Sequence, residues 1–224
     1  MRAAHQPYHH GNVKDSLLAV ALELIDANQG ELISLRKLAN AVGVTPSAVY
    51  NHFADRNALM LAIKIRIYEK FNRFFEARFS GTDNPEEALL EICFAYYQFS
   101  KKHPSQYHFL FSSTLPLEWT TPEAVKVFCR SLARTRKIIF EIYQKHQISC
   151  SEETIVQSTL LIWSQLHGIV MLRNSGSIQA AVSYQEWPQS CALARDEEVE
   201  ELIRLRVDLM LNGIIEGRHG GRSH

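Results

Sequence analysis

The sequence predicts an all-α protein built from an N-terminal three-helix helix-turn-helix domain and a larger C-terminal helical domain. Apolar residues recur at three- and four-residue spacing along most of the chain, and no alternating strand pattern is present. Helix-starting and helix-ending residues separate these periodic segments from one another. With 224 residues, 46% of them hydrophobic, the chain can bury a sizeable core.

Four helices are predicted before residue 80, each opening on a side chain that can cap it. The caps are Asn12, Ser34, Thr45 and Asp55. The first helix ends near Asn28, Gly43 ends the second, and the fourth runs to about Phe79. Pro46 stands at the first position of the third helix, where a missing N–H has no cost.

The boundary between the two domains is predicted at residues 80–83, a Ser-Gly-Thr-Asp run typical of turns. Residues 1–56 form the first domain, residues 84–214 form the second, and the helix over 55–79 connects them. The helices expected in the second domain are 84–102, 105–112, 121–147, one from Ser149 or Ser151 to Asn174, and 196–212. Residues 176–195 are expected to form a loop.

Charge and cysteine content narrow the class of protein. Lys and Arg number 24 and Asp and Glu number 24, so any contact with nucleic acid depends on a local patch. The N-terminus has no apolar signal-like segment, and no two cysteines form a CxxC pair. The cysteines are Cys93, Cys129, Cys150 and Cys191. We therefore expect a cytoplasmic protein with reduced thiols and no cofactor.

One segment is apolar enough to suggest a membrane span. Residues 155–172 carry no Asp, Glu, Lys or Arg. Polar side chains interrupt the segment, among them Gln157, Gln165 and His167, and these groups would be costly in lipid. We expect a helix buried between other helices, and no membrane partner.

The most informative stretch runs from Ser34 to Phe53. Two short capped helices joined through Gly43 allow the second helix to enter the major groove of DNA. Its outward face carries small and hydrogen-bonding groups suited to phosphates and base edges. These groups belong to Thr45, Ser47, Ala48, Tyr50, Asn51 and His52. A structural helical corner is the alternative interpretation.

Three runs of residues give this region a family resemblance. They are Leu35-Arg36-Lys37-Leu38-Ala39, Ala41-Val42-Gly43-Val44-Thr45, and Tyr50-Asn51-His52-Phe53 followed by Asp55, Arg56 and Leu59. Over residues 8–79 the chain resembles the DNA-binding domain of TetR-family (tetracycline-repressor-like) regulators.

The resemblance implies roles for particular residues. The implied phosphate contacts are Ser34, Arg36, Thr45, Tyr50 and His52, and the implied base-reading positions are Ser47 and Ala48. Arg56 stands where the family more often has lysine, and it keeps the charge. Over residues 1–56 the five cations balance five anions, which predicts modest non-specific affinity for DNA.

Two downstream segments, His103 to Phe111 and Trp163 to Gly168, resemble the C-terminal domain of a TetR subgroup named for its Trp/His-Gly motif. This resemblance implies a homodimer whose C-terminal domain binds a small effector that releases DNA. We expect the helix containing Trp163 and the last helix to form the dimer bundle. A twofold dimer implies a pseudo-palindromic operator.

Aromatic and polar residues downstream are the candidate effector contacts. They are Phe94, Tyr97, Phe109, Tyr143, Trp163, Gln165 and His167. Buried amides and imidazoles need partners, which suits Gln165 and His167 for orienting a ligand. Packing within the core or against the dimer mate is the alternative.

No constellation in the sequence predicts catalysis or metal binding. Ser164 and His167 lie three residues apart, but neither an orienting carboxylate nor a nucleophile elbow accompanies them, so we expect no enzyme activity. No His or Cys set has convincing metal-ligand spacing.

Taken together, these features predict a repressor that a small, largely apolar ligand releases from a double-stranded DNA operator. An activator or a regulator gated by a protein partner is the first alternative. The second is a helical ligand carrier or enzyme with a vestigial DNA-binding domain.

Overall fold

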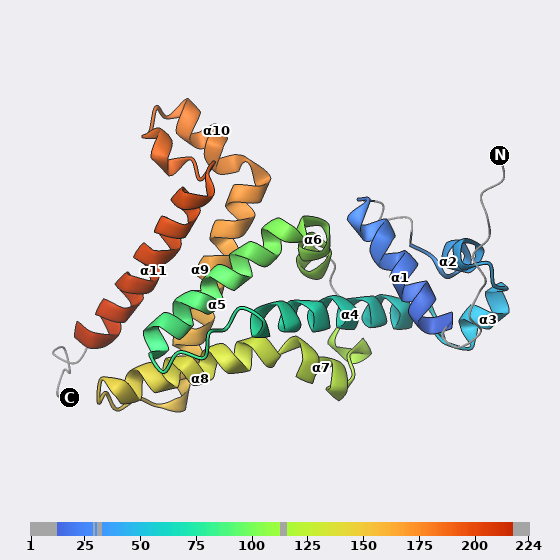
Figure 1. The fold of residues 1–224 in the computed structure, drawn as a ribbon, viewed down its shortest axis with the longest axis horizontal. Helices are drawn as coiled ribbons and strands as arrows, with labels where there is room; N and C mark the ends of the chain where they lie inside the picture. The colour runs from blue at the N-terminus through green and yellow to red at the C-terminus, as the bar shows by residue number, and fades with distance from the viewer. Residues whose placement is uncertain (1–12, 29, 31–32, 113–115, 217–224) are drawn as a thin grey trace. The chain divides into compact units, whose positions relative to one another are not determined.

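The computed structural model describes residues 13–28, 30, 33–112 and 116–216, and the regular structure in these ranges is entirely helical (Figure 1). This confirms the predicted all-α class. The chain divides into two compact units, unit 1 with Met1–Phe71 and His103–Phe128, and unit 2 with Asn72–Lys102 and Cys129–His224. The domain limits expected from the sequence, 1–56 and 84–214, remain a prediction.

Unit 1 is formed by the first helices of the chain together with a later pair. Its elements are α1 (Val13–Asp26), α2 (Leu35–Val42), α3 (Pro46–Tyr50), most of α4 (Arg56–Glu76), α6 (Pro104–Ser112), the short 3-10 helix η2 (Leu117–Trp119) and α7 (Pro122–Phe128). The helices α1, α2 and α3 lie together at the blue end of the ribbon (Figure 1). Buried residues of these helices and of the start of α4 include Leu17, Ala21, Leu38, Val49 and Leu59.

Polar groups attach α6 to the first helices of unit 1. Gln106 is buried, donates from Nε2 to both carboxylate oxygens of Asp26 at 2.9 and 2.8 Å, and accepts from Nζ of Lys70 at 3.0 Å. The buried Lys64 donates to the carbonyl of Leu110 at 3.1 Å, and burial lowers its pKa. These bonds fix α6 against α1 and α4, because buried polar groups hold their partners strongly.

Unit 2 is a bundle around α5 (Pro85–Lys102). Its other elements are α8 (Arg130–Lys145), α9 (Glu152–Ser175), α10 (Ser177–Tyr184), the 3-10 helix η3 (Gln189–Cys191) and α11 (Asp196–Glu216). α5 contacts α8, α9 and α11, and ten of its eighteen residues are buried. Because three helices contact α5, its buried residues form a wide face rather than a narrow stripe.

The expected helix starts and stops agree with the structure at several positions. The Oδ1 atom of Asn84 accepts from the backbone N–H of Glu86 at 3.2 Å, and Pro85 opens α5. Of the two serines considered, Ser151 caps α9 by accepting from Thr154 N–H at 3.1 Å. Gly176 ends α9 with φ of 71°, a left-handed conformation that glycine adopts without strain. The Asn12 cap lies outside the described residues.

Other expected boundaries were wrong. The helix expected over 121–147 is two helices, α7 and α8, interrupted at Cys129 where the chain passes from unit 1 to unit 2. No glycine or proline marks this break in the sequence. The loop expected over 176–195 contains α10 and η3, α4 ends at Glu76, and α11 continues to Glu216.

The apolar helix α9 is not buried between helices within one chain, contrary to expectation. Its inward face contains Ile155, Thr159, Ile162, Leu166 and Val170, all buried. Its other side exposes a series of large apolar side chains, which are Val156, Leu160, Leu161, Trp163, Met171 and Leu172. An 18-residue stretch of α9 has a mean hydropathy of 1.4, so the helix is long and apolar enough to span a membrane by length and composition only, as core helices of soluble proteins can also be.

Candidate nucleic-acid interface and ligand site

The helix α2 is fixed at both ends by its own sequence. The Oγ atom of Ser34 accepts from Lys37 N–H at 3.2 Å, which satisfies a free donor of the first turn. Gly43 has φ of 77°, and its N–H and that of Val44 return to carbonyls of the last turn. The chain therefore reverses tightly, as the sequence predicted.

The helix α3 starts two residues after this turn. Oγ1 of Thr45 accepts from Ala48 N–H at 3.3 Å, and Pro46 takes the first helical position. Val49 and the following Phe53 are buried and hold α3 on the unit 1 core. Because Val49 and Phe53 point into the core, the side chains between them, Tyr50, Asn51 and His52, face solvent.

The predicted DNA contacts are accessible on this corner. Tyr50 is 57% exposed, Ser34 and Ala48 are half-buried, and the remaining members of the set are exposed. Those members are Arg36, Thr45, Ser47, Asn51, His52 and Arg56. The arrangement offers hydroxyl, amide, imidazole and guanidinium donors from two successive helix starts, which suits binding to a phosphate backbone.

Three of the carboxylates counted in this region have identified partners. The carboxylate of Asp15 pairs with Arg66, that of Asp26 accepts from Gln106, and that of Asp55 caps α4 through Ala58 N–H at 2.8 Å. Of these three carboxylates only that of Asp15 has a cationic partner, and the other two have hydrogen-bond donors that are neutral. In the described part of the chain Arg36 and Arg56 have no ion pair, so their charge remains available to a phosphate.

Two family models match the chain over these helices and beyond. Residues 17–63, which include α2, α3 and the turn between them, match the model described as "Bacterial regulatory proteins, tetR family". Residues 89–187 match "Tetracyclin repressor-like, C-terminal domain". The chain belongs to the TetR family of transcriptional regulators. The second match also covers Trp163, His167 and Gly168, the motif noted in the sequence.

Known proteins are similar to this TetR-family regulator in sequence or in fold. A relative from Mycobacterium tuberculosis, an uncharacterized HTH-type transcriptional regulator (Rv0681), is 24% identical and aligns with 73% of this chain and 71% of its own length. A Rhodococcus sp. RHA1 structure of unknown function has a TM-score of 0.69 at 23% identity, over 93% of this chain and 98% of that one. A TetR-family regulator from Marinobacter aquaeolei VT8 has a TM-score of 0.60 at 15% identity, over 88% and 94%.

The predicted effector contacts of the TetR-family chain are distributed over several environments. Phe109 belongs to unit 1, whereas the other six residues belong to unit 2. Tyr143 shares a hydrogen bond of 3.1 Å with Ser158, and Oε1 of Gln165 accepts from Arg206 at 3.3 Å. The ring of Phe94 lies under the guanidinium of Arg204, 4.6 Å from its centroid. Their role in binding a ligand stays a prediction.

His167 and Trp163 lie together on α9. The hydroxyl of Tyr96 and Nδ1 of His167 are 2.8 Å apart, and the Trp163 ring lies 6.3 Å from the imidazole between centroids. Burial lowers the pKa of His167, so its imidazole is neutral at pH 7. Ser164 donates to the carbonyl of Leu161 at 3.0 Å. Ser164 and His167 therefore each have a hydrogen-bond partner other than the other residue.

Tyr97, another predicted contact, belongs to a charged cluster at the start of α11. Its hydroxyl donates to Asp196 at 2.7 Å, and the same carboxylate pairs with Lys101 and with Arg173. The hydrogen bonds from Lys101 and Tyr97 lower the pKa of Asp196, while burial raises the pKa of Tyr97. This cluster joins α5, α9 and α11, and it keeps Tyr97 buried as part of the core.

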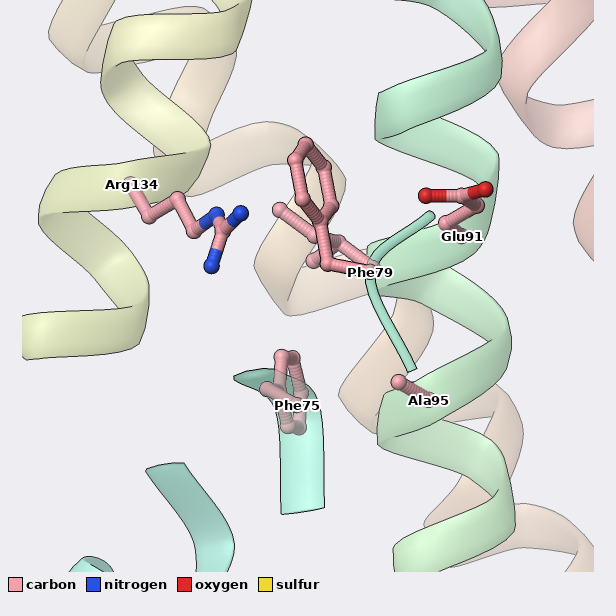
Figure 2. Close-up of a pocket in the computed structure, with 6 residues that line it drawn as sticks. Phe75, Phe79, Glu91, Ala95 and Arg134 are labelled. Atoms are coloured by element: carbon pink, nitrogen blue, oxygen red, sulfur yellow. The ribbon is translucent and has the colours of Figure 1, made fainter. Parts of the chain in front are cut away.

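Sequence reasoning missed a small hollow in unit 2. Its lining comes from the end of α4, the segment after it, α5 and α8, and consists of Phe75, Phe79, Glu91, Ile92, Ala95 and Arg134 (Figure 2). The hollow is shallow, because its enclosed space of about 10 Å³ holds roughly one water molecule and the rest is open to solvent. None of these residues was expected to contact a ligand, because only the packing of three separate segments brings them together.

Metal and thiol chemistry find little support in the described residues. No group of three or more His, Cys, Asp or Glu side chains lies close enough to hold a metal ion there. Cys93 is buried, and burial raises the pKa of its thiol to about 12, which keeps it protonated at neutral pH. Cys129 and Cys191 are exposed.

Proposed function

We propose that this TetR-family regulator is a cytoplasmic homodimeric repressor, released from a pseudo-palindromic operator by a small, largely apolar effector bound in unit 2. The observation that carries the proposal is the exposed donor set on α3, with Tyr50 and its neighbours facing solvent above a buried Val49. Side chains of this kind fix a helix on phosphates and read base edges in the major groove.

The exposed apolar surface of α9 and α11 supports the dimer. On α9 the exposed side chains flank Gly168, where an added Cβ would meet no atom within 4 Å, so a neighbouring helix can approach closely. On α11, Leu205 and Leu209 are each 51% exposed and lie four residues apart on one face. Two copies of this surface form a four-helix bundle, and a twofold dimer presents two α3 helices to half-sites about 34 Å apart.

A binding titration against operator DNA tests the proposal that the protein binds DNA. The probe is the DNA upstream of the protein's own gene, with random DNA of equal length as the reference, at two salt concentrations. Tyr50→Ala is expected to weaken binding about tenfold, because it removes a hydrogen bond to a charged phosphate. Tyr184→Ala is the matched control, since Tyr184 is 85% exposed and lies on α10.

The outcomes separate the candidate functions. Tight, salt-dependent binding that only Tyr50→Ala weakens supports a specific regulator. Binding no tighter than to random DNA, with or without a cell extract as the source of effector, would refute it. Transcription from this DNA in vitro then distinguishes a repressor, which lowers the transcript level, from an activator, which raises it.

A further inference from the structure

The helix α1 carries a single cation, Lys14, in its first turn. Lys14 is exposed, and among the described residues no carboxylate oxygen lies within 4.0 Å of its Nζ atom. The positions three and four residues later are Leu17 and Leu18, which offer it no carboxylate. The helix dipole also disfavours a cation in the first turn. The stability of α1 therefore does not account for a lysine at this position.

The acidic residues of α1 do not neutralise Lys14. The neighbouring Asp15 pairs instead with Arg66 at 2.5 Å. Glu23 and Asp26 lie further along the helix, about 13 Å or more from Lys14 on the helix axis and beyond the screening length of about 10 Å at 0.1 M salt. The start of α1 therefore presents a positive charge to solvent.

The ring of Phe53 places this cation beside the end of α3. The Nζ atom of Lys14 lies 5.9 Å from the centroid of the Phe53 ring, close enough for the ring to attract the cation. Phe53 is buried and comes directly after the exposed side chains of Tyr50, Asn51 and His52. Lys14 thus lies next to the donor set of α3, although it belongs to another helix of the same corner (Figure 1).

A second cation follows the same end of α3. Arg56 comes three residues after Phe53, begins α4 and is exposed. The Asp55 carboxylate beside it caps α4 by accepting from Ala58 N–H. Two helices therefore each supply one cation next to the residues that α3 exposes. A helix that enters the major groove is bordered by backbone phosphates, so cations beside it meet phosphates rather than base edges.

We propose that Lys14 binds a backbone phosphate of DNA beside the C-terminal end of α3, so that α1 forms part of the DNA-binding surface. The contact lies outside the set predicted from the sequence, which begins at Ser34. A phosphate contact raises the affinity for any DNA and fixes the position of α3 in the groove. The inference rests on DNA binding by the helix-turn-helix, and it requires neither repression nor release by an effector.

Binding titrations of the full chain against the upstream DNA and against random DNA test this contact, each over a series of salt concentrations. Lys14→Gln should weaken binding roughly eightfold at about 0.1 M salt, because a lysine on one phosphate releases about 0.9 counterion. The slope of log affinity against log salt should become shallower by about 1. Both DNAs should show the same loss, since the contact reads no sequence.

Two further variants serve as controls. Lys14→Arg keeps the charge and should keep the salt slope of the parent chain. Lys126→Gln removes the same charge from an exposed side chain of α7, outside the helix-turn-helix, and should leave the slope unchanged. Circular dichroism verifies that each variant is folded. A parental salt slope in Lys14→Gln would overturn the proposal, as would an equal loss in Lys14→Arg, which would indicate a packing role on Phe53.

The random DNA separates this inference from the proposed function. If the upstream DNA binds no more tightly than random DNA but Lys14→Gln makes the salt slope shallower on both, the phosphate contact stands and the specific regulator fails. If Tyr50→Ala weakens binding to the upstream DNA while Lys14→Gln matches the parent chain, the regulator stands and the Lys14 contact is wrong.

Discussion

Single side chains determine where the helices of unit 1 begin. Ser34, Thr45 and Asp55 each accept from a backbone N–H three residues later, and each was expected from the sequence because such caps depend on local geometry alone. The exposed polar side chains on α3 were predictable for the same reason. Its accessibility follows from the positions of the buried Val49 and Phe53 within one short segment.

The cap at Asp55 gives a prediction for stability. Asp55→Ala should lower the free energy of unfolding by about 1 kcal/mol, because Ala58 N–H loses its acceptor at the start of α4. Asp83→Ala is the control, since Asp83 is exposed and lies in the segment between α4 and α5. Urea denaturation followed by circular dichroism measures both. An equal effect of the two substitutions would contradict the capping role.

At the scale of elements, the sequence predicted helix boundaries less well where they depend on tertiary packing. The start of α5 was predicted from Asn84 and that of α9 from Ser149 or Ser151, of which Ser151 is the cap, and such caps act within one turn. The break at Cys129 has no local signal, and α10 forms in a segment of mixed composition. The hollow beside Phe79 was also unpredictable, because it requires the end of α4, α5 and α8 to meet.

The contact between the start of α5 and the end of α8 gives a pH-dependent prediction. Glu86 accepts from Lys145 at 2.6 Å and from His146 at 2.8 Å. Burial raises the pKa of Glu86, but the hydrogen bonds from Lys145 and His146 outweigh it, so the net pKa is lowered from 4.5. The stabilisation is therefore complete above about pH 4.5, the unfolded value, and is lost as the pH falls through the lower folded value.

Glu86→Gln should accordingly destabilise the chain by about 1–2 kcal/mol at pH 7, since it removes hydrogen bonds to a charged group. The difference between the variant and the parent should shrink as the pH is lowered below 4.5. Thermal unfolding across a pH series measures this. A difference that stays constant down to pH 3 would show that the Glu86 carboxylate is not responsible.

At the scale of the whole molecule, the exposed apolar surface of α9 and α11 predicts that the protein is a dimer. Leu160→Asp places a charge in this surface, where Leu160 is 47% exposed, and should convert the dimer to monomer because an unpaired charge is costly to bury. Val125→Asp is the control, as Val125 is 39% exposed but lies on α7. Light scattering after size exclusion gives the mass. A monomeric parent chain, or a dimer that tolerates Leu160→Asp, would exclude this interface.

In the proposed dimer, the same exposed apolar surface of α9 and α11 would connect operator occupancy to gene dosage. When chains are scarce and most are unpaired, the number of pairs varies with the square of the number of chains, so halving synthesis reduces pairs about fourfold. Operator control then has a threshold in protein abundance, even before any effector is present. If dimerisation covers α9, a newly made chain carries exposed apolar side chains on this helix until it meets a second chain, and its lifetime against proteolysis would depend on how fast that encounter occurs.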